Sequence, residues 1–269
     1  MYLADYHLHS TCSPDGECTI AQMARSAVEH GLQEICVTDH LDTVEWGTYA
    51  PRTDFPWAEA RRQLEEAREK WGDRLTIKLG AELGEAALAF NRAEKLLGDA
   101  PELDFVIGSV HMMGPRHGHE DLYFIPRADE AFYRDVIADY LDDVLTLSRW
   151  GKFQVLGHLT LPLRYIRSNA GLTMDFSAHM DAVEEIFRTI IPKGVGIECN
   201  TNRGDIPLPD GEILRRYREM GGEIITIGTD AHDTRYVGCR VAETQELLRQ
   251  CGFRYFTTFA KGVPEFRPL

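Results

Sequence analysis

The chain of 269 residues lacks the sequence features that mark secreted, membrane-spanning and disulfide-stabilised proteins. Its first residues, MYLADYHLHS, contain neither the basic segment nor the apolar segment of a secretory signal peptide. Its apolar runs are too short to span a bilayer, and one of the longest extends only from Ile224 to Ile227. The six cysteines form no CxxC pair, and such scattered cysteines are typical of reduced cytosolic thiols. We therefore expect a cytoplasmic protein without a membrane partner.

Positive charge is also scarce. The chain has 29 Lys and Arg residues against 43 Asp and Glu residues, which gives a net charge of -14. Non-specific binding to nucleic acid or to an anionic membrane requires basic patches, so this balance argues against a nucleic-acid partner. It does not argue against a small substrate that carries a phosphate, because a few arginines or a metal ion can reverse the local field.

Short apolar runs with strand character alternate with charged, amphipathic segments along the whole chain. We expect strands at Leu3–Tyr6, Glu34–Thr38, Thr76–Ala81, Phe105–Gly108, Gln154–Leu156, Gly196–Cys199, Glu223–Ile227 and Arg254–Thr257. We expect helices at Ile20–His30, Trp57–Trp71, Leu88–Leu97, Asp129–Trp150, Ala178–Ile191, Gly211–Met220 and Ala242–Gln250. This alternation predicts an α/β fold with a parallel sheet, and seven or eight strand–helix units in this length favour a closed barrel. Because no break in composition divides the chain, we expect one domain over residues 1–269.

Six of the ten histidines fall at or just beyond the C-terminal ends of the expected strands. They are His7, His9, His40, His111, His158 and His232, and they are accompanied by Asp15, Asp39, Glu82, Glu198 and Asp230. In a parallel barrel these strand ends converge on one face, where active sites are built. His7 and His9 are two residues apart in an extended segment, so both rings point to the same side and can reach one ion.

The mixture of imidazole nitrogen and carboxylate oxygen suits Zn²⁺, Fe²⁺ or Mn²⁺. The candidate ligands outnumber the four positions around one tetrahedral ion, which indicates a cluster of ions. Taken singly, Asp15 in SPDG is typical of a turn, Glu82 of a strand-end charge and Asp230 of a helix N-cap. Their shared position at strand ends favours the ligand role. Asp39 either orients a ligating imidazole or caps a strand end.

The residues lie in the stretches YHLHSTCSPDG, VTDH, GAELG, IGSVH, LGHL, ECNTN and GTDAH. In this order they resemble the motifs of the PHP (polymerase and histidinol phosphatase) superfamily and, within it, the histidinol-phosphate phosphatases. The resemblance implies a distorted, TIM-like (β/α)7 barrel with three divalent metal ions, Zn, Fe or Mn. It implies a first ion held by His7, His9, Glu82 and Asp230, a second by Glu82, His111 and His158, and a third by Asp15, His40 and His232.

The resemblance also implies a phosphoric monoester hydrolase that uses metal-bound hydroxide, acting on L-histidinol phosphate to give L-histidinol and phosphate in histidine biosynthesis. Asp230 or His232 would protonate the leaving alkoxide. Cys12 and Cys199 lack the Cx5R loop of cysteine phosphatases, so we expect no phospho-enzyme.

Arg164 and Arg203 follow strand ends in GHLTLPLRY and ECNTNRG, and relatives carry arginines in similar stretches. We expect both to bind the substrate phosphate, because the planar guanidinium matches two phosphate oxygens; the alternative is a solvated arginine on the barrel rim. Thr160 stands where family members often have aspartate, a difference that bears on which alcohol leaves.

Two other functions remain open. One is a PHP phosphoesterase that acts on a nucleotide, a sugar phosphate or a nucleic-acid end, and the other is a non-catalytic module that binds metal for stability. The acidic balance weighs against a polymeric nucleic-acid substrate, and the complete ligand set weighs against a silent module. No pattern in the sequence indicates an oligomeric state.

Overall fold

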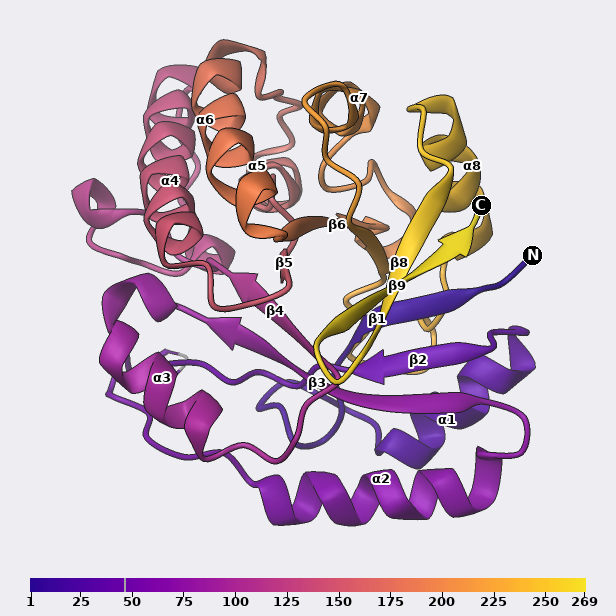
Figure 1. Ribbon diagram of the computed structural model, residues 1–269. Coiled ribbons are helices and arrows are strands. Elements are labelled where there is room, and N and C mark those ends of the chain that lie inside the picture. The colour runs from indigo at the N-terminus through magenta and orange to yellow at the C-terminus, as the bar shows by residue number, and fades with distance from the viewer. Residues whose placement is uncertain (46) are drawn as a thin grey trace.

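Seven parallel strands form one sheet, and each strand lies beside the strand that follows it in the sequence (Figure 1). This computed structural model describes residues 1–45 and 47–269. The strands are β1 (Ala4–Leu8), β2 (Glu34–Val37), β3 (Thr76–Gly84), β4 (Phe105–Ser109), β5 (Val155–Leu156), β6 (Gly196–Asn200) and β7 (Ile225–Gly228). A bridge between Leu8, the last residue of β1, and Ala231, just past the end of β7, brings the two strands together. The sheet is therefore a nearly closed barrel, which confirms the expected (β/α)7 fold and its single domain.

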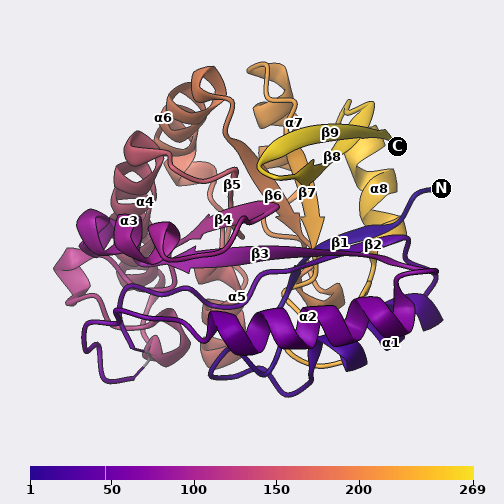
Figure 2. The same ribbon diagram turned by 60° about the horizontal axis from the view of Figure 1, so that its bottom comes forward.

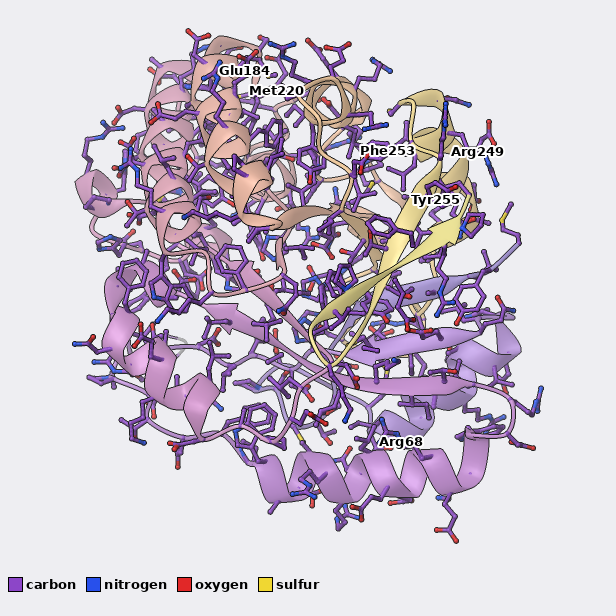
Figure 3. The ribbon with its side chains drawn as sticks, in the orientation of Figure 1. Arg68, Glu184, Met220, Arg249, Phe253 and Tyr255 are labelled. Carbon is purple, nitrogen blue, oxygen red and sulfur yellow. The ribbon has the colours of Figure 1, made fainter. Side chains whose placement is uncertain are left out.

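Seven of the eight helices in the described part of the chain have bounds close to those expected from the sequence, and α5 is the exception. The eight are α1 (Ile20–Glu29), α2 (Trp57–Trp71), α3 (Phe90–Gly98), α4 (Glu130–Trp150), α5 (Pro162–Ala170), α6 (Met180–Ile190), α7 (Gly211–Glu219) and α8 (Val241–Gln250). Side-chain caps start several of them: Thr19 and Gln22 form a capping box at α1, and Asp129 accepts from the Phe132 N–H at α4. The charged side chains of Arg68, Glu184 and Arg249 lie on the outer helices (Figure 3).

Helix α5 was not expected from the sequence. Pro162 occupies its first turn, where a missing N–H is tolerated, and Gly171 ends it with a positive φ of 71°. Nine residues with a proline near the start give a weak helical pattern, so the segment resembled a loop. The helix matters for function because Arg164 lies in its first turn.

The last expected strand, at Arg254–Thr257, is not an eighth unit of the barrel. β8 (Tyr255–Ala260) pairs antiparallel with β9 (Val263–Pro268) to form a separate hairpin, shown in yellow in Figure 1 and from another side in Figure 2. The hairpin contacts the amino-terminal ends of the barrel strands: Ile225 N donates to Thr257 Oγ1 at 3.2 Å, and Gly262 N donates to the Asp104 carbonyl at 2.9 Å. The hairpin thus covers the end of the barrel that lies away from the histidines.

Aromatic rings fill the barrel interior at this amino-terminal end. Tyr6 packs edge-on against Phe105 with ring centroids 5.2 Å apart, and Phe105 stacks on Phe259 of the hairpin at 4.9 Å. All three side chains are buried, and the Tyr6 hydroxyl donates to the buried Glu34 carboxylate. Within the described part of the chain, no helix is both long and apolar enough to cross a bilayer. The interior is thus largely aromatic at the amino-terminal end of the barrel, whereas polar side chains gather at the carboxyl end.

Candidate active site

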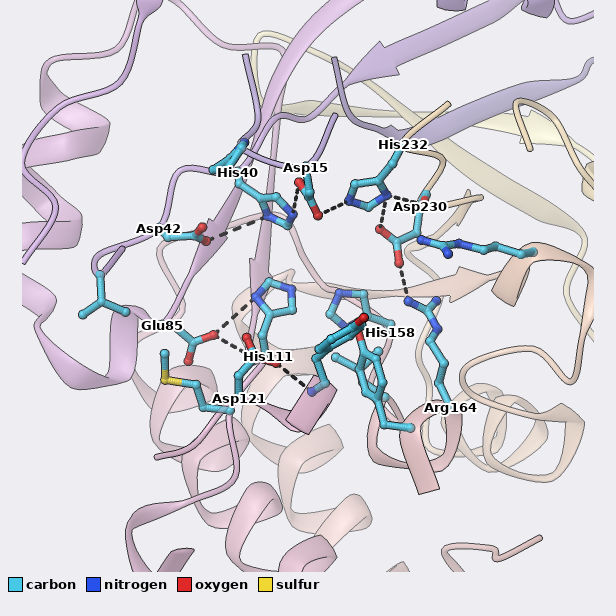
Figure 4. A pocket seen from close by; sticks show the side chains of 17 residues that line it. Asp15, His40, Asp42, Glu85, His111, Asp121, His158, Arg164, Asp230 and His232 are labelled. Carbon is cyan, nitrogen blue, oxygen red and sulfur yellow. Dashed lines mark hydrogen bonds and ion pairs between the residues drawn. The ribbon is translucent and has the colours of Figure 1, made fainter. Parts of the chain in front are cut away.

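The six histidines expected at strand ends converge at the carboxyl end of the barrel. There a pocket of about 360 Å³ is lined by His40, His111, His158 and His232, and also by Asp15, Asp230, Arg164 and Arg203 (Figure 4). His7, His9 and Glu82 are fully buried beside it. The structure therefore brings every residue of the predicted site into one region, from loops and strands that are far apart in the sequence.

Glu82, near the end of β3, is the centre of this arrangement. Its two carboxylate oxygens face the ring nitrogens of five histidines: His158 at 2.8 Å, His40 at 2.9 Å, His111 at 3.2 Å, His7 at 3.3 Å and His9 at 3.6 Å. A carboxylate with two oxygens and ligands on both sides has the geometry to bridge two cations. This placement agrees with the bridging role that the family resemblance implied for Glu82.

Eight of the nine predicted ligands form four groups in which three ligand atoms lie within 4.8 Å of one another. The groups are His9, His40 and His232; His7, His9 and Asp230; His7, Glu82 and His158; and His40, Glu82 and His111. The ninth, Asp15, lies beside them, with its oxygens 3.0 Å from His232 Nε2 and 3.6 Å from His40 Nε2. These clusters could hold metal ions.

Unpartnered buried atoms test whether a cation fits. Among the residues that the structure describes, five buried atoms of the cluster make no well-aligned hydrogen bond, although His40 Nδ1 lies 2.9 Å from Glu82 Oε2: His7 Nε2, His9 Nε2, His40 Nδ1, His158 Nδ1 and Glu82 Oε2. A buried polar atom without a partner is costly, and native proteins rarely leave several together. Four of the five face neighbouring ligand atoms of the cluster, where a bound cation would satisfy them. The donor set therefore fits a metal centre.

The carboxylates of the cluster are held in their anionic form. Burial alone would raise the pKa of Glu82, but His7, His111 and His40 outweigh burial and hold that pKa well below its usual range. Burial is likewise outweighed at Asp230, where Arg164 and His7 keep the pKa of the carboxyl well below its usual range. Anionic carboxylates are the form that binds a divalent cation.

Glu198 in β6 contacts the ring of one candidate ligand, His7, and the backbone of another, His158. Its Oε1 lies 2.7 Å from His7 Nδ1, and its Oε2 accepts the His158 backbone N–H at 2.7 Å. Carboxylates commonly fix the tautomer of ligating histidines in this way, leaving Nε2 free for the ion. Gly228 makes room for the contact, since a Cβ atom there would lie 2.2 Å from Glu198 Oε1. The sequence placed Glu198 at a strand end but did not indicate this role.

Asp39 acts on His9 through a serine. It accepts hydrogen bonds from Ser10 N at 2.6 Å and from Ser13 Oγ at 2.8 Å, and Ser13 Oγ lies 3.2 Å from His9 Nδ1. Of the two roles considered for Asp39, the geometry favours orientation of an imidazole, although the contact is indirect.

The two predicted arginines lie differently. Arg164 donates from Nη1 to Asp230 Oδ2 at 2.5 Å, and its side chain is only 15% exposed (Figure 4). Arg203 also lines the pocket; it has a positive φ of 54°, and its guanidinium lies 5.6 Å from the Tyr236 ring centroid. Thr160 is buried and is not among the described residues that line the pocket.

Several pocket residues were missed by sequence reasoning. Glu85 has a positive φ of 57° and accepts the His111 backbone N–H at 2.7 Å (Figure 4). Asp42, Asp121, Tyr123 and Tyr165 also line the pocket. None of these residues stands in a pattern that distinguishes it from an ordinary surface or loop residue, so the sequence offered no signal for them.

Comparisons with known proteins identify the family and several relatives of this chain. The model of the PHP domain family matches residues 5–202. The histidinol-phosphatase of Lactococcus lactis subsp. lactis is 29% identical over 262 residues, covering 95% of this chain and 94% of the relative. A probable histidinol-phosphatase of Thermotoga maritima is 28% identical, covering 97% of both chains. The crystal structure of the Lactococcus lactis histidinol phosphate phosphatase, complexed with Zn, L-histidinol and phosphate, superimposes with a TM-score of 0.82 at 24% identity and covers 98% of each chain.

Proposed function

This chain belongs to the PHP domain family, and we propose that it hydrolyses L-histidinol phosphate to L-histidinol and phosphate. Phosphoric monoester hydrolysis is the activity for which the relatives described above are named, and they match this chain over nearly its whole length. The observation that carries the proposal is the Glu82 carboxylate surrounded by five histidines beside a buried arginine. The cytoplasmic location and the place in histidine biosynthesis remain predictions.

We propose that three divalent ions, Zn, Fe or Mn, bind in the cluster. The ligands would be His7, His9, Asp15, His40, Glu82, His111, His158, Asp230 and His232. When bound, such ions neutralise phosphate oxygens, lower the pKa of a water molecule and align it with the scissile bond. Glu198 and Asp39 would hold His7 and His9 in the tautomers that present Nε2 to this region.

Arg164 and Arg203 would bind the phosphate oxygens that face away from the ions. Asp230 or His232 would protonate the leaving alkoxide, and the contacts of each residue limit its role. His232 Nδ1 lies 2.9 Å from the Asp230 carbonyl, so Nε2 is the nitrogen that faces the pocket. Nε2 alone would therefore serve either as a metal ligand or as the proton donor. Arg164 keeps the pKa of Asp230 low, which favours the ligand role for Asp230.

The pocket lining supports an aromatic, cationic leaving group. It includes the aromatic residues Tyr123 and Tyr165 and the acidic residues Asp42 and Asp121. Histidinol has an imidazole ring and an ammonium group, which an aromatic face and a carboxylate recognise. A neutral sugar offers neither group.

The experiment that tests the proposal measures phosphate release by metal-loaded protein from histidinol phosphate, AMP and a sugar phosphate. We expect kcat/KM for histidinol phosphate to exceed the other two by at least about 100-fold, since the pocket has groups for the ring and for the amine. Comparable slow turnover of all three would overturn the choice of substrate and leave a broader phosphatase. No turnover of any ester by fully loaded protein would favour a non-catalytic metal-binding module.

A further inference from the structure

The guanidinium of Arg164 is held by two asparagines as well as by Asp230. Its Nε donates to Asn202 Oδ1 at 2.8 Å, and its Nη2 donates to Asn200 Oδ1 at 3.2 Å. Together with the Nη1 bond to Asp230, the three nitrogens of the fork each have a protein acceptor. A solvated arginine on a barrel rim would not be fixed at all three nitrogens.

Two N–H groups of the fork remain for a ligand. Arginine has five N–H groups, and the three bonds to described residues use one on each nitrogen. One N–H is left on each terminal nitrogen, and Arg164 lines the pocket that contains the metal cluster. N–H groups on the two terminal nitrogens of an arginine can bind two oxygens of a phosphate.

The asparagines are themselves fixed by the chain around them. Asn202 Nδ2 donates to the Ile206 carbonyl at 2.8 Å, and Asn202 N donates to Asn200 Oδ1 at 2.9 Å. Asn202 has a positive φ of 50°, a conformation that asparagine tolerates better than most residues. The local backbone therefore aims the Asn202 amide oxygen at Arg164.

The same contacts connect the arginine to the metal cluster. Asn200 Nδ2 donates to Glu198 Oε1 at 3.3 Å, the oxygen that lies 2.7 Å from His7 Nδ1. On the other side of His7, Nε2 lies 3.7 Å from Asp230 Oδ1, while Asp230 Oδ2 accepts from Arg164. The five side chains form a closed ring in which the candidate ligands and the arginine share partners.

We propose that Asn200 and Asn202 are positioning residues that hold the Arg164 fork in the orientation that binds the substrate phosphate, a proposal that rests on the proposed phosphatase function. Arginine loses considerable side-chain freedom when it is fixed. Here the conformational entropy of the Arg164 side chain is lost on folding, so phosphate binding does not have to offset that cost. Neither asparagine is among the described residues that line the pocket, so both would act through Arg164.

The first test replaces Asn202 with glycine, which keeps the positive φ and removes the amide. In N202G we expect KM for the phosphate ester, and Kd for inorganic phosphate measured calorimetrically on metal-loaded protein, to rise about tenfold, as for the loss of one charge-assisted hydrogen bond. We expect kcat to change by less than about threefold and the bound metal per chain to stay at the wild-type value.

A second variant separates positioning from support of the loop. N202D keeps an oxygen acceptor for Arg164 Nε but loses the donor to the Ile206 carbonyl. If Asn202 acts through Arg164, KM in N202D stays within about threefold of wild type. If its role is only to hold the loop, N202D and N202G have the same raised KM, and the proposal is wrong.

A double-mutant cycle tests the route through Arg164. In the R164A background, N202G should raise KM no further, because the residue through which it acts is gone. A KM in the double variant R164A/N202G tenfold above that of R164A would overturn the proposal. N91A, which removes an exposed asparagine on helix α3, is the matched control and should match wild type in all measurements.

The outcomes distinguish the two proposals. If wild-type protein hydrolyses no phosphate ester, the proposed function is wrong, and the phosphate isotherms of wild type and N202G still decide the role of Asn202. If wild type is active and N202G retains wild-type KM and Kd, the positioning role is wrong and the proposed function stands.

Discussion

Replacing Glu198 with glutamine tests whether this carboxylate of β6 supports metal binding by orienting the His7 ring. Glu198 presents one oxygen to His7 Nδ1 and the other to the His158 N–H, each at 2.7 Å. Glutamine has one oxygen and one NH2 group, so one of these two N–H donors would face another donor. If that donor is His7, its ring relaxes to the tautomer with the proton on Nε2, which removes the lone pair that faces Glu82.

The expected loss of metal affinity follows from measured contributions of the hydrogen-bond partners of ligating histidines in other metalloproteins. Losing the partner of a ligating histidine lowers metal affinity by about 10- to 100-fold, or roughly 1.4 to 2.7 kcal/mol. The change is isosteric and leaves all nine candidate ligands in place, so the fold should be retained. The assay is Zn²⁺ affinity by competition with a chromophoric chelator at fixed pH, together with metal content per chain.

E94Q is the matched control. Glu94 lies on helix α3, is 46% exposed and pairs with Lys152 at 2.6 Å, far from any candidate ligand. An exposed ion pair of this kind contributes little, so E94Q should bind Zn²⁺ as wild type does. A Zn²⁺ affinity for E198Q within twofold of wild type, with the protein folded, would show that the carboxylate does not orient His7.

Four further outcomes are expected. Removal of metal by a chelator should abolish phosphatase activity and lower the Tm in calorimetry, and Zn²⁺ or Mn²⁺ should restore both; an unchanged Tm would contradict a metal-linked fold. H9A and H111A should each lose at least about 1,000-fold in kcat, and near-normal turnover in either would remove that residue from the centre. R164A should raise KM at least about tenfold with a smaller change in kcat, and an equal KM would exclude it from phosphate binding. G228A places a Cβ atom 2.2 Å from Glu198 Oε1, so urea unfolding should show a loss of about 1–3 kcal/mol, whereas wild-type stability would mean that the strand can shift.

The barrel could be predicted from the sequence because each of its strands is a short apolar run in a regular alternation. The parts that were missed lack such a pattern. Helix α5 is nine residues long with a proline in its first turn, and β9 contains two prolines and has no buried residue, so neither shows a clear period. The hairpin formed by β8 and β9 also depends on packing against Tyr6, more than 250 residues away along the chain, which local reasoning does not reveal.

The metal ligands could be predicted for a topological reason. Parallel strands carry whatever follows them to one face, so a histidine at a strand end has a known destination even when its neighbours are unknown. The positioning residues have no such rule. Asn202 meets Arg164 across 38 residues, and Glu85 meets His111 across 26, through loop conformations with positive φ that the sequence does not specify. Residue type and strand position predict the candidate ligands, whereas their supporting contacts depend on loop geometry.

The distribution of polarity inside the barrel explains why fold and metal binding should be coupled. At the amino-terminal end the interior holds the rings of Tyr6, Phe105 and Phe259, and at the carboxyl end it holds Glu82 among five histidines. Buried ionisable groups with unpartnered atoms oppose folding, because water would solvate them in the unfolded chain. A cation bound only by the folded state offsets this opposition and shifts the equilibrium toward the barrel. The rings of the amino-terminal end stabilise the barrel without metal, whereas we expect the carboxyl end to gain stability when ions bind to its ligand cluster.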